Sequence, residues 1–422
     1  MDSKIKLTHK IKQQIGKFTG IISKNYSKPQ KKFIKEILYG IQASKDIKLS
    51  NISRTLQEKI PLIKTENRLS RNLSLYDMSD DINQIISKLS SARIYEDTVI
   101  ALDPGDISKK YAKKMEKMCI VHDGSENKLS NGYWTCQVVA SNMDENDIIP
   151  MYCEAYSTES DDFTSTNTQI IKAIDTVSKS IENSGIWVID RGGDSKMFFQ
   201  KFVSERKRFV IRLQKKRNIV FKTKTYNVGK FTNKIKCKDC RQIIYYKNGK
   251  EYIRNIRYGA EKIKLPDWDE IFYLVVVKGF GKDPMILLTN CVVIPFLSES
   301  VWRMVDVYLT RWKCEETYRY IKQSYNLEDI RVRSLKAIRN IVVLLVAVAY
   351  FVTTYIGKNI KMKLAMEKIF ILSKRFFAIP AFSGYAIADG IHRLFFNCRK
   401  GINDDCIKLK SPLDFQLSLP FG

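Results

Sequence analysis

The stretch YLTRWKCEETYRYIK, residues 308–322, has the composition of a helix and carries the pattern that decides the fold. At about 100° per residue, four of its polar side chains fall within a sector of about 60° on one helix face. These four are Tyr308, Arg311, Glu315 and Lys322. A solvated helix with i,i+4 ion pairs gives a similar stripe, but aromatic residues point in several other directions around this stretch. We therefore expect a packed helix that presents a carboxylate among cations.

Two short apolar stretches upstream each end on an aspartate. DTVIALD, residues 97–103, ends on Asp103, and GIWVID, residues 185–190, ends on Asp190. Both stretches predict β-strands, and functional groups often gather at the carboxyl ends of sheet strands, because side chains there stand free of the hydrogen-bonded ladder. A single aspartate at a strand end is commonly only a turn or cap residue. Together with Glu315, however, the two aspartates form a candidate set of three carboxylates from separate elements.

The surrounding segments predict an α/β fold with one mixed sheet and flanking helices. Further strands are expected at 131–140, 148–157 and 208–213, and helices at 167–183 and 194–205. Residues 214–290 alternate like β-strands around an Asn248-Gly249 turn, which indicates a β-rich insertion that interrupts the sheet. The expected organisation is a helical basic DNA-binding region at 1–90, the first part of the sheet domain at 91–213, the insertion at 214–290, the completion of the domain by the Glu-bearing helix at 291–345, and a helical C-terminal region at 346–422.

The charge of the chain indicates a polyanionic partner. The net charge of +27 arises from 72 Lys and Arg against 45 Asp and Glu, and nucleic acid is the usual partner of such proteins. Residues 1–75 have a basic surplus of 12 and residues 206–264 a surplus of 17, so the rest of the chain sums to −2. The first surplus falls on three expected helices, which suggests a unit related to helix-turn-helix domains; a plain helical bundle with a basic solvated face is the alternative. These helices are expected at 28–44, 49–60 and 62–75.

The cysteine content and the hydropathy of the chain indicate the compartment in which the protein is expected. Nine cysteines, an odd number, and an N-terminus without an apolar run indicate a reduced, cytoplasmic environment. Cys237 and Cys240 form a lone CxxC pair, and no second pair follows at zinc-site spacing. The most apolar run, 341–356, is 16 residues long. Since a bilayer span needs roughly 20 residues, we expect a buried core helix and no membrane partner.

Three carboxylates from separate elements suit phosphodiester chemistry. Such a set can hold two divalent metal ions about 3.5–4 Å apart, which activate a water or a 3′-hydroxyl and stabilise the leaving oxygen. Mg²⁺ prefers oxygen ligands, so Asp and Glu side chains suffice. The cations on the same helix face, Arg311 and Lys322, are suited to hold phosphates of a DNA end, and the Tyr308 hydroxyl can hydrogen-bond one.

The spacing Y308-x2-R311-x3-E315-x6-K322 resembles the Tyr–Arg–Glu–Lys signature of DDE transposases of the insertion-sequence-four family. IDRGGDS, residues 189–195, resembles the motif around that family's second Asp, and IALDPGD, residues 100–106, stands where the first is expected. The resemblance runs from about residue 97 to 345, and the basic N-terminal helices also look like those of the family. It implies an RNase H-like catalytic domain with a β-rich insertion and cut-and-paste transposition of a bacterial insertion sequence.

The resemblance also implies partners and cofactors. Two Mg²⁺ ions, for which Mn²⁺ substitutes, would support nicking by water and then attack by the freed 3′-hydroxyl, often through a DNA hairpin. The substrates would be double-stranded DNA, namely the terminal inverted repeats and the target, with a homodimer pairing two ends in a synaptic complex. The expected location is the bacterial cytoplasm, at the nucleoid.

Residue by residue, the resemblance assigns Asp103, Asp190 and Glu315 as the metal-binding catalytic triad. It assigns DNA-phosphate contacts to Tyr308, Arg311 and Lys322, with Arg191 as a further candidate beside the second Asp. The first motif departs from the family, because Pro104 follows where Thr or Ser is usual, and this leaves Asp106 as an alternative first carboxylate. Asp194 is an alternative to Asp190, although Asp190 ends its strand and precedes Arg-Gly.

Three rival functions share parts of this pattern. A nuclease or resolvase would keep the RNase H-like site but perform no strand transfer. A non-catalytic nucleic-acid-binding protein derived from a transposase would not depend on Glu315. A tyrosine recombinase needs Arg and His residues around a nucleophilic Tyr, whereas the histidines here are scattered at positions 9, 122 and 392.

Overall fold

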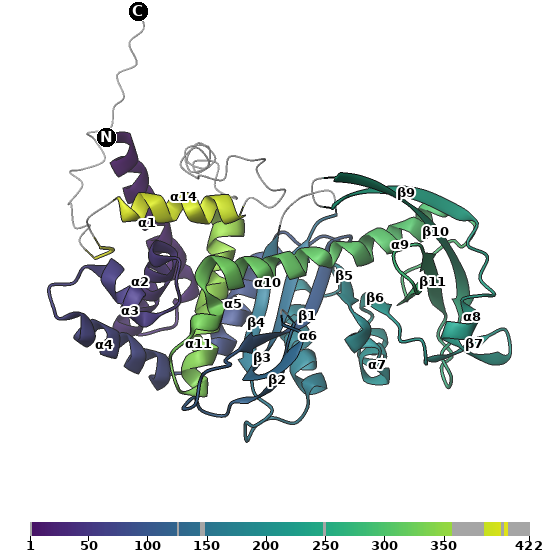
Figure 1. Cartoon of the computed structure of the whole chain (residues 1–422), viewed down its shortest axis with the longest axis horizontal. Coiled ribbons are helices and arrows are strands. Elements are labelled where there is room, and N and C mark those ends of the chain that lie inside the picture. The colour runs from purple at the N-terminus through teal and green to yellow at the C-terminus, as the bar shows by residue number, and fades with distance from the viewer. Residues whose placement is uncertain are drawn as a thin grey trace, which may run out of the picture.

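The computed structural model describes residues 2–124, 126–143, 148–247, 250–356, 384–397 and 401–403. Helices form one end of the molecule, and a long sheet extends from them to the other end (Figure 1). The first five helices are α1 Asp2–Ile22, α2 Lys28–Ser44, α3 Leu49–Leu56, α4 Leu62–Leu75 and α5 Ser79–Ser91. The bounds of α2 and α4 are those predicted, whereas α1, with 21 residues, is longer than the short helices expected there.

The central sheet begins as predicted, with mixed strand directions. Its strands on this side are β1 Val99–Ser108, β2 Cys119–Asp123, β3 Lys128–Ser141, β4 Ile149–Tyr156, β5 Ile186–Ile189 and β6 Arg208–Arg212. β3 is antiparallel to β1, while β5 and β6 run parallel to β1 in the order β3-β1-β5-β6. β2 and β4 both pair with β3. Helix α6, Thr166–Ile181, precedes β5, and α7, Lys196–Ser204, connects β5 to β6.

The predicted end of the first strand at Asp103 was wrong, because β1 continues to Ser108. The reason lies in its two neighbours. The parallel partner β5 stops at Ile189, which faces Leu102, but the longer β3 continues the antiparallel ladder through the pair Ser108 and Gly132. Asp103 is therefore paired with β3 on one side of β1, whereas on the other side it lies one residue beyond the last pair with β5.

The β-rich segment does not form a separate unit but lengthens the same sheet. Its strands are β7 Asn218–Phe221, β8 Lys224–Asn227, β9 Asp239–Lys247, β10 Lys250–Ile263, β11 Phe272–Lys278 and β12 Met285–Thr289, with the short helix α8 at Val228–Phe231. β12 pairs with β6, and β11, β10 and β9 follow outward to give a 10-stranded sheet, while β7 and β8 pair with each other. β11 and β12 are buried almost throughout, as expected of inner strands. The predicted turn at Asn248-Gly249 lies outside the described residues.

The helix predicted around residues 308–322 is divided at Arg311 into α9, Ser298–Thr310, and α10, Trp312–Tyr325. The backbone of Arg311 remains helical (φ −52°, ψ −29°), but the turn tightens there. The Arg311 N–H donates to the Tyr308 carbonyl at 3.2 Å, and the Cys314 N–H donates to the Arg311 carbonyl at 2.8 Å. The two helices lie end to end across the sheet (Figure 1). Because the backbone of Arg311 stays helical, the side-chain face predicted from the sequence continues through the junction.

The apolar C-terminal run forms a core helix. A short 3₁₀ turn, η2 at Leu327–Asp329, precedes α11, Leu335–Tyr350. α11 then continues directly into the π-helix η3, Phe351–Tyr355. In the described part of the chain this is the one helix whose length and hydropathy would suffice for a membrane span, and 89% of its apolar 18-residue window is buried inside the fold. The last described helix is α14, Gly384–Phe396; residues 357–383, 398–400 and 404–422 of the predicted helical region lie outside the described residues.

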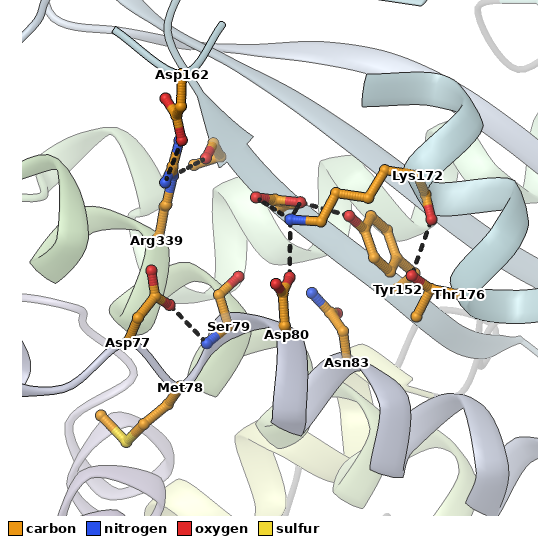
Figure 2. A network of polar contacts seen from close by, with 12 residues as sticks. Asp77, Met78, Ser79, Asp80, Asn83, Tyr152, Asp162, Lys172, Thr176 and Arg339 are labelled. Atoms are coloured by element: carbon orange, nitrogen blue, oxygen red, sulfur yellow. Dashed lines mark hydrogen bonds and ion pairs between the residues drawn. The ribbon is translucent and has the colours of Figure 1, made fainter. Parts of the chain in front are cut away.

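A polar network fixes the N-terminal helices to the sheet (Figure 2). Lys172 of α6 contacts Asp80 of α5 at 2.8 Å and the buried Glu154 of β4 at 2.9 Å. The side chain of Asn83 of α5 exchanges two hydrogen bonds with the backbone of Cys153 in β4, both of 3.0 Å. The helical end and the sheet therefore share a specific interface rather than a bare apolar contact.

Candidate active site

The two predicted aspartates lie side by side because of the parallel register of β1 and β5. Leu102 of β1 and Ile189 of β5 are the last partners of this pair of strands, and Asp103 and Asp190 are the next residue of each chain segment. Asp190 leaves β5 with extended backbone angles (φ −72°, ψ −172°), just before the 3₁₀ turn η1 at Arg191–Gly193. The carboxyl ends of the two strands thus bring two carboxylates to one edge, as expected for this class of sheet.

Arg311, at the junction of α9 and α10, connects these aspartates to the helix. Its Nη1 lies 3.3 Å from Asp103 Oδ1, and its Nη2 lies 2.8 Å from Glu315 Oε1. The Tyr308 hydroxyl donates to Asp190 Oδ1 at 2.9 Å. The structure therefore brings five of the predicted site residues into one cluster. We call the set of Asp103, Asp190, Tyr308, Arg311 and Glu315 the carboxylate cluster.

Burial and crowding set the electrostatics of the carboxylate cluster. Burial raises the pKa of Asp103 to about 7; Arg311 opposes this rise, while Glu315 and Asp190 add to it. Burial, followed by the nearby Asp190 charge, raises the pKa of Tyr308 to about 12, so the phenol remains a proton donor at neutral pH. Burial alone would lower the pKa of Arg311, but the carboxylates around it raise it on balance, so the guanidinium stays charged.

The donor chemistry of the carboxylate cluster fits a hard divalent cation. All three acids offer oxygen, and their side chains remain 23% exposed at Asp103, 43% at Asp190 and 38% at Glu315, which leaves each carboxylate an accessible side. Over the residues that the structure describes, no group of three or more His, Cys, Asp and Glu side chains is arranged to hold a metal ion. The Arg311 guanidinium instead bridges Asp103 and Glu315, so in this conformation a protein cation supplies the positive charge.

Lys322 and Asp106 form a second charged pair farther along β1 and α10. Lys322 Nζ lies 3.3 Å from Asp106 Oδ2 and 3.0 Å from Glu328 Oε1. The Tyr318 hydroxyl also donates to the Asp106 carbonyl, and the Lys322 ammonium lies 4.8 Å from the centre of the Tyr318 ring. The structure thus places the fourth signature residue beside the alternative first carboxylate, and apart from the contacts of Arg311.

The other two candidates differ in their surroundings. Asp194, the alternative second carboxylate, is buried in a salt bridge with Arg217, whose Nε lies 2.6 Å from Asp194 Oδ1, and it accepts a bond from the Gln214 N–H at 2.8 Å. These contacts give Asp194 a structural role in holding the chain after β6. Arg191 is exposed next to Asp190, where a DNA phosphate could reach it.

Two residues near the carboxylate cluster were not predicted from the sequence. Arg212 of β6 places Nη1 4.0 Å from Asp190 Oδ1. Gln137 of β3 is the register partner of Asp103, is 2% exposed, and has no hydrogen-bond partner for Nε2 among the described residues. Cross-strand partners share one face of a sheet, so this amide stands beside Asp103. No sequence pattern identifies either residue as part of the site, because each lies near the carboxylate cluster only through the pairing and register of its strand.

Comparison with known families agrees with this geometry. Residues 156–352 match the family model described as a transposase DDE domain. The chain therefore contains a transposase DDE domain. The matched segment includes Asp190 and the whole α9–α10 region but begins after Asp103, so the family match does not cover the candidate first carboxylate, which lies beside Asp190 through the register of β1 and β5.

The transposase has distant similarity to a solved structure. A cryo-EM structure of a piggyBac transposase synaptic complex with hairpin DNA shares 9% sequence identity, with a TM-score of 0.44. The alignment covers 92% of this chain and 80% of that chain. No curated protein sequence matches the transposase.

Proposed function

We propose that this DDE transposase catalyses cut-and-paste transposition of an insertion sequence through metal-dependent hydrolysis and strand transfer. The observation that carries the proposal is the carboxylate cluster: two aspartates at the paired ends of parallel strands, with Glu315 joined to them through Arg311. The DDE domain match supports a DNA substrate. The finer substrates we propose are the two terminal inverted repeats and a target duplex.

Asp103, Asp190 and Glu315 would hold the divalent ions, Mg²⁺ or in its place Mn²⁺. When bound, such ions activate a water or 3′-hydroxyl and stabilise the departing oxygen of a phosphodiester. The acids themselves supply negative charge that is balanced by one guanidinium, and the pKa of Asp103 is raised first by burial and then by the charges of Glu315 and Asp190. An added cation would relieve the repulsion among the three acids and release Arg311 from its bridging role.

The remaining residues of the carboxylate cluster orient the substrate and the acids. Tyr308 fixes Asp190 by donating its hydroxyl hydrogen to Oδ1. The guanidinium of Arg311 stays charged, and its Nε has no hydrogen-bond partner among the described residues. Once free of Glu315, Arg311 can bind two oxygens of a phosphate beside the scissile bond, since a guanidinium presents paired donors.

We further propose that two copies of the chain pair two DNA ends, and that the reaction takes place at the nucleoid in the bacterial cytoplasm. Joining two ends in one event requires two active centres, which a homodimer provides. The basic surplus of 17 in residues 206–264 supports a long contact with DNA phosphates from the extended side of the sheet.

The test compares Glu315→Gln with Glu316→Gln. Glu316 is the neighbouring acid on α10 and pairs with Arg319, so its replacement is a matched control for folding and for net charge. With Mg²⁺ and a duplex carrying the DNA that flanks the coding region, Glu315→Gln should bind DNA normally but show no cleavage, while Glu316→Gln cleaves.

Gel analysis of joined products separates the rival functions. Cleavage without joined end–target products would identify a nuclease or resolvase. DNA binding without cleavage by the native chain would identify a non-catalytic DNA-binding protein, and full cleavage by Glu315→Gln would overturn the proposal.

A further inference from the structure

Three adjoining clefts form a continuous groove between the catalytic domain and the N-terminal helices. The first, of about 630 Å³, lies between residues 108–115 and 328–333 at the far end of β1. The second, of about 450 Å³, shares Arg331 and Arg333 with the first and reaches α4. The third, of about 570 Å³, continues along α4 and shares Ser70 and Ser74 with the second. We call this surface the α4 groove.

A direct contact connects the two sides of the α4 groove. The hydroxyls of Ser74 in α4 and Ser334, just before α11, lie 3.2 Å apart. Lys109 fastens the other end, because its Nζ donates to the carbonyls of Glu328 and Ile330 at 2.6 Å each. The groove is therefore built from fixed elements whose sequence positions are far apart.

The positive charge of the α4 groove exceeds what its own acids neutralise. Nine Lys and Arg residues line the three clefts, against five acids, Glu66, Asp123, Glu126, Glu328 and Asp329. Three of these acids, Glu126, Glu328 and Asp329, are paired with Lys110, Lys322 and Lys48 respectively. In contrast, five exposed lining cations form no ion pair with any residue that the structure describes. These are Arg71, Lys113, Lys114, Arg331 and Arg333. Three short chain segments contribute them, so none of the basic surpluses seen along the sequence includes the full set.

Helix α4 turns a polar face into the α4 groove. Thr65, Leu69 and Leu73 face the core. The exposed positions Asn67, Arg71 and Ser74 follow at helical spacing. Asn and Arg are the side chains that most often read adenine and guanine in the major groove, and a helix fits the width of that groove. The exposed face of α4 thus has both the shape and the donors for contact with base edges.

We propose that the α4 groove binds double-stranded DNA, with α4 in the major groove and residues 113–114 and 331–333 on the phosphate backbone. The inference deepens the proposed function and rests on it, since the groove would hold the terminal repeat whose end enters the carboxylate cluster. Two salt bridges of Lys322 connect the α4 groove with the strand of the carboxylate cluster. One is with Glu328, which lines the groove, and the other is with Asp106 on β1, the strand that carries Asp103. Arg331 and Arg333 set affinity, and Asn67 and Arg71 set sequence preference.

The first experiment measures phosphate contacts through the salt dependence of binding. The full-length chain binds a fluorescein-labelled 30-base-pair duplex in a series of salt concentrations. Removing the two phosphate contacts in Arg331→Ala/Arg333→Ala should lower the slope of log affinity against log salt by about 2. Lys88→Ala/Lys179→Ala removes two exposed cations of α5 and α6 that do not line the groove, and should leave the slope unchanged.

The second experiment measures base reading. Selection from a pool of random duplexes should enrich one sequence with the native chain, and Asn67→Ala should lose about tenfold preference at one base pair of it. An unchanged salt slope, an equal loss in the control, or a native preference for RNA or single strands would overturn the inference.

Cleavage at saturating DNA separates this inference from the proposed function. If Arg331→Ala/Arg333→Ala binds like the native chain while Glu315→Gln still abolishes cleavage, the α4 groove is wrong as a DNA site and the transposase chemistry stands. If neither change has an effect, both proposals fail.

Discussion

Two aspartates three positions apart on β1, Asp103 and Asp106, each contact a cation of the α9–α10 helices, yet their surroundings differ. Asp106 has Lys322 at 3.3 Å, and its side chain is 10% exposed. Asp103 shares Arg311 with Glu315 and stands next to Asp190 beyond the end of the parallel ladder. Asp106 therefore has a settled partner, whereas Asp103 lies in a cluster with more acids than bases. The difference favours Asp103 as the first carboxylate of the proposed metal centre.

The largest expected effect is on DNA cleavage. Asp103→Asn should lower the Mg²⁺-dependent cleavage rate by at least about 10³-fold, since in the proposed mechanism it removes a ligand of the ions that stabilise the transition state. Asp106→Asn should cost far less, because it alters an ion pair outside the carboxylate cluster. Cleavage of a labelled duplex by each purified variant measures the two effects. Equal losses, or a greater loss in Asp106→Asn, would contradict the comparison.

A smaller effect is expected on stability against pH. The pKa of Asp103 is about 7 in the folded chain against 3.8 for the ordinary group, so the folded state binds this proton more tightly than the unfolded state. Stability from this group is therefore present at low pH and is lost as the pH rises through about 4 to 7.

Urea unfolding in the presence of EDTA checks this sign. Between pH 5 and pH 8 the native chain should lose about 2 kcal/mol more stability than Asp103→Asn does. Asp106→Asn should follow the native chain, because it keeps Asp103. Identical pH profiles for the native chain and Asp103→Asn would show that folding does not raise the pKa of Asp103.

The smallest effect concerns Gln137, which stands beside Asp103 in the ladder and has a free buried donor. Its amide can donate to an Asp103 oxygen and so orient that carboxylate toward a metal ion. Gln137→Leu, which keeps the volume, should weaken Mn²⁺ binding about tenfold in a calorimetric or spin-resonance titration. Lys322→Met, which disturbs the Asp106 side, serves as the control and should bind Mn²⁺ as the native chain does. Equal weakening of Mn²⁺ binding in Gln137→Leu and Lys322→Met would contradict a specific role of Gln137 beside Asp103.

Sequence patterns predicted which residues lie together in the carboxylate cluster, but they did not predict which contacts bring these residues together. Helical spacing grouped Tyr308, Arg311 and Glu315 correctly, because side-chain direction on a helix depends only on local geometry. The end of β1 was misplaced, because it depends on the length of β3, a partner strand about 30 residues later in the chain. The contact between Lys322 and Asp106 was not predicted for the same reason.

Longer-range arrangements were beyond local patterns altogether. The β-rich segment was predicted as an insertion along the chain, but its pairing with the central sheet was not predicted; β12 pairs with β6, and its apolar residues are buried inside this larger sheet. The α4 groove likewise depends on three segments meeting in space. No periodicity in any one of them indicates the other two.

The pairing of β12 with β6 has a mechanical consequence. Leu288 faces Ile211 in this ladder, and β6 in turn pairs with β5, the strand that delivers Asp190. The distal strands therefore cannot swing relative to the acids without breaking backbone bonds in the middle of the sheet. Under the proposed function, DNA held by the distal strands would therefore lie at a fixed distance from the carboxylate cluster, because both belong to one hydrogen-bonded sheet.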